Sequence, residues 1–426
     1  MAEFKAEVFQ NEYLSEGATD VHGVVSVSCT GAGVAGRATG TEAAEVIIVD
    51  TSGSMDMPPN KIAAARRAAK VALDEIVDGT WFAVVAGHTV AQMVYPTHPG
   101  LAKMTDITRR DASQAVTGLR SGGATAIGAW IAAATELFEQ APAGQRHAIL
   151  LTDGKIEGEP DGALDAALAN AMGKFQCDCR GIGSDWVVDE LRTISNALMG
   201  TVDIVAKPEN LEHDFEQMMR AAMRRGVADV RLRVWAPQGS EVLFVRQVAP
   251  QVEDITPRAV RISPLIVEFP TGAWSDESRD YHVAVRVPIA PVGNERLAAR
   301  VEIVVDDQVL SKALVKAIWS TDTNLTTRID PAVAHYTGQA QLADVIQRGL
   351  AAKSSGDERT ATVLLGEAAK LAHDTGNEDT TRLLAKVVDV VDLEAGTVRL
   401  KQQVDKSDEM ALDTRSTKTT RIRREP

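Results

Sequence analysis

Oxygen-bearing side chains are clustered at three points of this 426-residue sequence, each next to an apolar run or a Gly-rich stretch. The residues concerned are Asp50, Ser52 and Ser54 in a D-x-S-x-S arrangement, then Thr125, then Asp153. Oxygen donors alone suit a hard cation, so we expect Mg²⁺ here, with Mn²⁺ as the alternative. Two carboxylates neutralise the charge of such an ion, and hydroxyls add ligands without charge. No evident nucleophile or general base accompanies the set, which favours binding over catalysis and predicts that the protein is not an enzyme.

These residues need a scaffold that brings them to one place. The continuous apolar run at 46–49 is typical of a parallel strand buried on both faces. Further strand-like runs and stretches of helical periodicity alternate after it, which predicts an α/β fold: a doubly wound, mostly parallel, Rossmann-like sheet. The expected strands are 81–86, 147–151, 177–182 and 202–206, and the expected helices between them are about 106–117, 126–140, 162–173, 187–198 and 209–224. The carboxyl ends of the strands form one crevice in such a sheet, so the three clusters can meet there.

Residues 45–206 resemble a von Willebrand factor A (VWA) domain, of the bacterial cytosolic type, with a metal-ion-dependent adhesion site (MIDAS). The family's D-x-S-x-S motif matches Asp50, Ser52 and Ser54, its loop threonine matches Thr125, and its second aspartate matches Asp153. The resemblance implies that the three hydroxyls ligate a metal. It also implies that an Asp or Glu of a partner protein supplies the missing ligand.

The rest of the chain lies outside this resemblance. Residues 227–320 alternate between apolar and polar, which predicts an antiparallel β-sandwich with one face in water. Short alternating segments near 4–9 and 21–30 are expected to join that sandwich. Residues 331–392 return to helical periodicity with breaks near Gly356 and Gly376, which predicts a C-terminal helical bundle. The expected domains are 1–40 (N-terminal strands of the sandwich), 41–225 (VWA), 226–325 (sandwich), 326–395 (helices) and 396–426 (a disordered basic tail).

The tail is predicted to be disordered because the sequence from about Val404 has little apolar content. Five basic residues against one acidic residue lie between Arg415 and Glu425. Thr419 has the aliphatic Ile422 three residues later, which resembles a phosphothreonine ligand of forkhead-associated (FHA) domains. Thr419 is therefore a candidate phosphosite, and an FHA protein is a candidate partner.

Composition excludes several classes of protein. The formal net charge is −14, which argues against a protein that coats nucleic acid or anionic membrane. Three cysteines rule out a disulfide scaffold and suit a reducing compartment. No signal peptide and no apolar stretch long enough to span a bilayer is visible, so we expect a cytoplasmic protein with no nucleic-acid or membrane partner.

The preferred function is a scaffold that grips an acidic residue of a partner through Mg²⁺. An accessory subunit of an AAA+ ATPase and a component of a Ser/Thr kinase–FHA system stay open as alternatives. A phosphohydrolase of the haloacid dehalogenase type is disfavoured, because that chemistry needs a second Asp where Ser52 stands. Cys177 and Cys179 occupy alternate strand positions with no second Cys pair or His cluster, so we expect buried cysteines rather than a zinc site.

Overall fold

The chain forms two structural units in a computed structural model that describes residues 2–36, 42–58 and 60–422. Unit 1 contains Gly31–Asp229 and Gly272–Ser275, and unit 2 contains Glu3–Thr30, Val230–Thr271 and the described residues from Asp276 onward. The predicted boundary at 40/41 and the basic residues at 423–426 lie outside the described residues.

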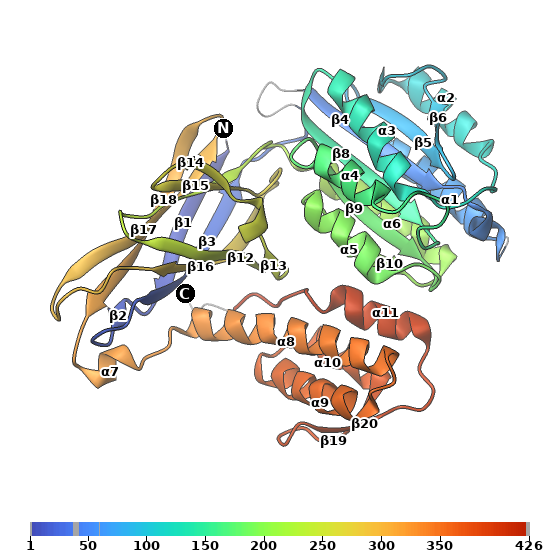
Figure 1. Cartoon of the computed structure of the whole chain (residues 1–426). Helices are drawn as coiled ribbons and strands as arrows, with labels where there is room; N and C mark the ends of the chain where they lie inside the picture. The colour runs from blue at the N-terminus through green and yellow to red at the C-terminus, as the bar shows by residue number, and fades with distance from the viewer. Residues whose placement is uncertain (1, 37–41, 59, 423–426) are drawn as a thin grey trace. The chain divides into compact units, whose positions relative to one another are not determined.

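Unit 1 is built on a seven-stranded sheet with the strand order β10-β9-β8-β4-β5-β6, and β7 pairs with β5 beside β6 (Figure 1). The strands are β4 (Glu42–Asp50), β5 (Trp81–Gly87), β6 (Ala91–Tyr95), β7 (Ala102–Lys103), β8 (Ala143–Thr152), β9 (Gln176–Ile182) and β10 (Val202–Val205). β4 pairs in parallel with both β5 and β8, whereas β6 and β7 run antiparallel to β5. The chain therefore adds β5 on one side of β4 and β8 on the other, so the strand order reverses between β4 and β8. This is the doubly wound, mostly parallel sheet that the sequence predicts.

Helices cover both faces of this sheet (Figure 1). They are α1 (Asn60–Glu75), α2 (Asp106–Thr117), α3 (Ile127–Gln140), α4 (Ala163–Ala171), α5 (Val188–Ala197) and α6 (Leu211–Met223). α1, α2 and α6 share one core with Ile47 and Val49 of β4. Neighbouring positions of a strand point to opposite faces, and α3 packs against β4 and β8 on the other side, with α4 beside it. β4 is consequently buried from Ala43 to Asp50, which explains its continuous apolar run.

Unit 2 contains a β-sandwich of two antiparallel sheets, except that the short β2 pairs in parallel with β18. One sheet has the order β1-β3-β16-β12-β13, and the other has the order β14-β15-β11-β17-β18-β2. The bounds are β1 (Glu3–Gln10), β2 (Tyr13–Leu14), β3 (Asp20–Thr30), β11 (Arg231–Trp235), β12 (Glu241–Ala249), β13 (Glu253–Asp254), β14 (Val260–Ser263), β15 (Ile266–Pro270), β16 (Glu277–Arg286), β17 (Glu295–Val305) and β18 (Gln308–Trp319). All of β16 pairs with β3. Strands from the start of the chain therefore complete a sheet with strands that come later in the sequence than most of unit 1.

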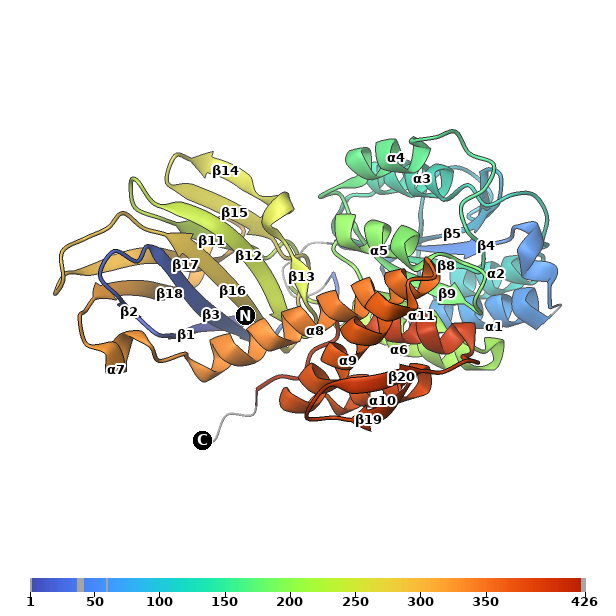
Figure 2. The ribbon, with the colours of Figure 1, turned by 60° about the horizontal axis from the view of Figure 1, so that its bottom comes forward.

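Helices and a hairpin follow the sandwich in unit 2 (Figure 2). They are α7 (Thr323–Thr326), α8 (Pro331–Ser354), α9 (Glu358–Asp374), α10 (Glu378–Val387), the hairpin β19 (Val388–Asp392) and β20 (Thr397–Leu400), and α11 (Lys406–Arg415). The side chains of Asp330, Asp357 and Asn377 accept hydrogen bonds from the first turns of α8, α9 and α10. Such caps satisfy backbone N–H groups that have no partner within the helix, so each helix has a defined start.

The predicted disordered tail is wrong for the described residues 396–422. These residues form β20 and α11, and Leu412 is fully buried in the core of the helices. Beyond α11, the backbone N–H of Val252 donates to the carbonyl of Thr417 at 2.7 Å, and the N–H of Thr419 donates to the carbonyl of Pro250 at 3.0 Å. The sequence has few apolar residues here, but Val398, Met410 and Leu412 are buried, and backbone hydrogen bonds to the segment after β12 hold Thr417 and Thr419.

No helix among the residues that the structure describes combines the length and the apolar character needed to cross a bilayer.

Candidate metal centre

The candidate site lies where the strand order of unit 1 reverses. Asp50 is the last residue of β4, Thr152 is the last residue of β8, and Asp153 follows it directly. In open α/β sheets this point is the usual ligand crevice, because the loops leave the two neighbouring strands in opposite directions. Asp50 and Asp153 are both fully buried, so two carboxylates stand side by side away from bulk water.

Hydrogen bonds join the D-x-S-x-S loop to both strand ends. The N–H of Ser52 donates to Asp50 Oδ1 at 2.6 Å, and the hydroxyls of Ser52 and Ser54 lie 2.9 Å apart. Ser54 Oγ donates to Asp153 Oδ1 at 2.6 Å. The loop can follow this path because it forms a short 3₁₀ turn, Gly53–Asp56, directly after the strand.

Thr125 reaches the same place from the Gly-rich loop before α3. The N–H of Gly53 donates to the carbonyl of Gly123 at 2.9 Å, which ties this loop to the D-x-S-x-S loop. Gly123 has φ +84°, and a Cβ atom there would lie 2.8 Å from Thr89 Oγ1, so a side chain is disfavoured both by the backbone and by space. The structure therefore brings all five predicted metal ligands to one edge of the sheet.

Two of the candidate hydroxyls lie next to Gly154. A Cβ atom placed on Gly154 would lie 3.0 Å from Thr125 Oγ1 and 3.3 Å from Ser54 Oγ. The absence of a side chain at Gly154 thus keeps two hydroxyls uncovered next to Asp153. Among the described residues there is no cluster of three or more His, Cys, Asp or Glu side chains that could hold a metal ion. A metal at this site therefore depends on hydroxyl ligands as well. The donor set fits a hard divalent cation.

Electrostatics favour a cation at Asp50. Burial raises the pKa of Asp50 to about 6, although hydrogen bonds from Ser52 and Thr152 oppose that shift. A carboxylate whose charged form is destabilised by burial gains from a nearby positive charge. The pKa therefore indicates a charge that the protein's own groups compensate only in part.

Two residues of the site were missed by the sequence reasoning. Thr152 Oγ1 donates to Asp50 Oδ2 at 2.5 Å, and Lys61 Nζ lies 2.6 Å from Asp153 Oδ2. Lys61 carried one usable signal: a lysine in the first turn of a helix opposes the helix dipole, so it needs another reason to be there. For Thr152, the only signal in the sequence was its position next to Asp153.

The other candidate positions do not belong to this site. Thr419 belongs to unit 2, and its hydroxyl donates to the carbonyl of Val248 at 2.7 Å. A phosphate on that oxygen would break this bond, so the expectation of a freely accessible phosphosite is corrected. Cys177 and Cys179 are free and buried, and their sulfur atoms lie 4.0 Å apart. The hydrogen bond between the two thiols and burial raise the pKa of Cys177, which disfavours the thiolate that a soft metal needs.

A cavity of about 750 Å³ adjoins the loops of the candidate site. Its lining includes Thr51, Gly122 and Gly123 from the loops of the site, and Val90, Met93 and Arg120 from beyond them. Val90 is 55% exposed and Arg120 is exposed, so the cavity offers apolar surface and a cation next to the site.

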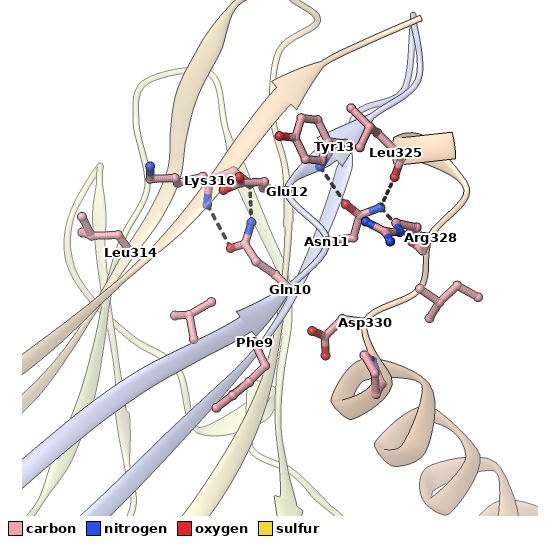
Figure 3. A pocket seen from close by; sticks show the side chains of 13 residues that line it. Phe9, Gln10, Asn11, Glu12, Tyr13, Leu314, Lys316, Leu325, Arg328 and Asp330 are labelled. Carbon is pink, nitrogen blue, oxygen red and sulfur yellow. Dashed lines mark hydrogen bonds between the residues drawn. The ribbon is translucent and has the colours of Figure 1, made fainter. Parts of the chain in front are cut away.

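A second cavity, of about 790 Å³, lies in unit 2 between β1, β18 and the start of α8 (Figure 3). The carboxamide of Gln10 donates to the carbonyl and accepts from the N–H of Lys316, and Asn11 donates to the carbonyls of Leu325 and Arg328. These side chains hold strand β1 and the segment before α8 in place. We therefore interpret this cavity as structural.

Comparisons with known proteins agree with the fold. Residues 44–204 match the von Willebrand factor type A domain, and residues 370–416 match the von Willebrand factor type A C-terminal domain. A solved structure described as von Willebrand factor type A from Catenulispora acidiphila is 46% identical, with a TM-score of 0.94 over 99% of this chain and 97% of that chain. The ArnB paralog VWA2 from Sulfolobus acidocaldarius is 14% identical, with a TM-score of 0.61 over 98% of each chain, and at this identity the likeness shows the fold alone. The search of curated proteins found no match.

The site and sheet define an α/β protein with an oxygen-lined crevice at its switch point. The chain belongs to the von Willebrand factor type A family, whose members often bind a metal at a MIDAS and mediate protein interactions.

Proposed function

We propose that this protein binds Mg²⁺ at the crevice of unit 1 and uses it to hold an acidic side chain of a partner protein. The observation that carries the proposal is the convergence of two buried carboxylates and three hydroxyls at the ends of β4 and β8. The residues that would hold the ion are Asp50, Ser52, Ser54, Thr125 and Asp153. A bound Mg²⁺ supplies a positive centre that can accept one more oxygen ligand.

The surroundings of the site suit a protein partner. Met57, in the same loop as Ser54, is 72% exposed, and the adjoining cavity exposes Val90 and Arg120. Apolar side chains beside a charged site are typical of interfaces in which a few central residues supply most of the affinity. Arg120 adds positive charge, which favours an acidic partner. The proposal places the protein in the cytoplasm, in keeping with its three free, buried cysteines.

The proposal also assigns no catalysis to this site. The residue two positions after Asp50 is Ser52, whose hydroxyl lies 2.9 Å from that of Ser54. A hydroxyl at this position cannot serve as the general acid and base of a phosphohydrolase that uses a pair of aspartates. Release of phosphate from a generic phosphate ester by the purified protein with Mg²⁺ would contradict this assignment.

Thermal melting of the full chain tests the metal site. A ligand at a hundred times its Kd stabilises the folded state by about 2.7 kcal/mol, so MgCl₂ should raise the Tm of the wild type above its value in EDTA. Asp50→Ala should abolish the rise. Asp56→Ala is the matched control, because Asp56 is exposed in the same loop, and it should keep the rise. An equal response of Asp50→Ala and wild type would overturn the site assignment.

The partner is tested separately. Proteins captured from the native cell in Mg²⁺ should be lost both in EDTA and with Asp50→Ala, and they should stay with Asp56→Ala. For a captured protein, substitution of one Asp or Glu by Asn or Gln should remove binding. A partner that binds equally with and without the metal would contradict the proposed role.

A further inference from the structure

Lys61 is a buried cation in direct contact with a metal ligand. It is the second residue of α1, and its side chain is 5% exposed. Its Nζ atom lies 2.6 Å from Asp153 Oδ2 and 3.5 Å from Asp185 Oδ2, and Asp185 is mostly exposed. Asp153 therefore contacts two neighbours: its Oδ2 atom lies next to Lys61, and its Oδ1 atom accepts a hydrogen bond from Ser54.

The helix does not explain why a lysine is placed here. The N-terminus of a helix carries partial positive charge, so an ammonium group in the first turn of α1 is repelled by the helix dipole. Burial of the ammonium group adds a desolvation cost. The contact with Asp153 offsets both. Gly183, just after the end of β9, lies beside the lysine stem, since a Cβ atom there would be in van der Waals contact with Lys61 Cε at 3.7 Å.

We propose that Lys61 is a permanent internal cation of the metal site, which weakens metal binding and keeps the loaded site positively charged. This inference rests on the proposed function. Asp50, Asp153 and Lys61 together carry one net negative charge, and a divalent ion changes that to one net positive charge. Without Lys61 the same groups would carry two negative charges before metal binding and none after it.

Two opposite effects follow from this charge count. A neutral side chain at position 61 should strengthen metal binding, because a positive charge that repels the ion is gone. The same substitution should weaken the attraction of the loaded site for a carboxylate. A residue that only supported the fold would not change these two affinities in opposite directions.

The experiment measures Mn²⁺ and Mg²⁺ binding by the full chain, with each metal alone as the probe. Lys61→Met and Lys61→Gln should bind both ions about tenfold more tightly than the wild type. Lys61→Arg keeps the charge and should bind within about threefold of the wild type. Lys70→Met is the matched control, because Lys70 is a half-buried lysine further along α1, and its affinity should equal that of the wild type.

Acetate then serves as the probe for a partner carboxylate. It is titrated into the Mn²⁺-loaded protein, and water-proton relaxation reports the displacement of bound water. Acetate affinity should fall about threefold or more in Lys61→Gln and stay unchanged in Lys70→Met. Lys61→Gln retains a polar group next to Asp153, so it keeps the test available if Lys61→Met does not fold.

The outcomes separate this inference from the proposed function. If the wild type binds neither metal, the proposed function fails and the inference fails with it. If the wild type binds metal and Lys61→Gln binds it no more tightly, only the role of Lys61 is overturned.

Discussion

Thr152 donates a 2.5 Å hydrogen bond to Asp50, although the two residues are 102 positions apart in the sequence. They are the last residues of the neighbouring strands β8 and β4. This bond holds Asp50 Oδ2, while the N–H of Ser52 holds Oδ1. The orientation of Asp50, the first proposed metal ligand, therefore depends on a strand that is not its own.

Thr152→Val should lower the affinity for Mg²⁺ without removing a ligand. Loss of a hydrogen-bond partner behind a metal ligand typically costs about 10- to 100-fold in metal affinity. Titration calorimetry with MnCl₂ or MgCl₂ measures the change. Thr135→Val is the matched control, because Thr135 is also buried but donates to the carbonyl of Ile131 within α3. An affinity equal to that of the control would show that Thr152 does not support the site.

Gly154→Ala should impair metal binding by filling space among the ligands. The new Cβ atom would lie 3.0 Å from Thr125 Oγ1 and 3.3 Å from Ser54 Oγ, where it crowds both hydroxyls. The rise in Tm on addition of MgCl₂ should shrink or vanish. Gly53→Ala is the control within the same site, since its nearest contact is the carbonyl of Gly123 at 3.5 Å. A normal rise in Gly154→Ala would place the ion elsewhere.

Unit 1 should lose stability as the pH rises from about 6.5 to 9. His147 lies 2.8 Å from Glu45 and 2.9 Å from Asp178, and all three side chains are buried. Burial acts to lower the pKa of His147, but the two carboxylates outweigh it and raise that pKa to about 9. The folded state therefore holds a proton that the unfolded chain releases near pH 6.5. The stabilisation is complete below pH 6.5 and is lost as the pH approaches 9.

This pH dependence can be followed through the buried thiols of β9. The protein is incubated in urea at each pH and given a short pulse of thiol labelling at a fixed pH. Peptide mass spectrometry then reports the exposure of Cys177 and Cys179 separately from that of Cys29 in unit 2. The urea midpoint should fall between pH 6.5 and 9 in the wild type and in His98→Gln, an exposed control. In His147→Gln the urea midpoint should fall less steeply with pH than in the wild type. A wild-type midpoint that is flat or rises over this range would refute the prediction.

Arg421→Ala should destabilise unit 2 although the residue lies near the C-terminus. Arg421 Nη2 donates to Asp280 Oδ1 at 2.9 Å and to Ser26 Oγ at 2.8 Å, and Asp280 is fully buried. Loss of the guanidinium leaves Asp280 with less compensation for its charge. Arg421 is 40% exposed on its side chain, so solvent screening reduces the effect to about 1 to 2 kcal/mol.

Urea denaturation of the full chain measures this change. Arg382→Ala is the control, because Arg382 forms an exposed ion pair with Asp379 on α10, and it should change stability by less than about 0.5 kcal/mol. Equal stabilities of the two variants would mean that the Arg421 contacts do not hold the C-terminal segment.

The sequence by itself determined the doubly wound sheet and the five candidate ligands. Both are encoded locally: apolar runs and helical periodicity mark strands and helices, and the D-x-S-x-S loop lies within five consecutive positions. The topology of a parallel sheet then requires its strands to end at one edge, so the strand pattern is enough to place Asp50 and Asp153 together.

Only the tertiary structure decided which groups support those ligands and what happens to the C-terminal segment. Lys61 and Asp153 are 92 positions apart, and Arg421 and Asp280 are 141 positions apart. A charged residue in a polar stretch has the same local pattern whether it is solvated or paired with a buried carboxylate. The difference arises from burial of a distant partner, because an unpaired charge in the interior costs more free energy than the ordering of a short polar segment.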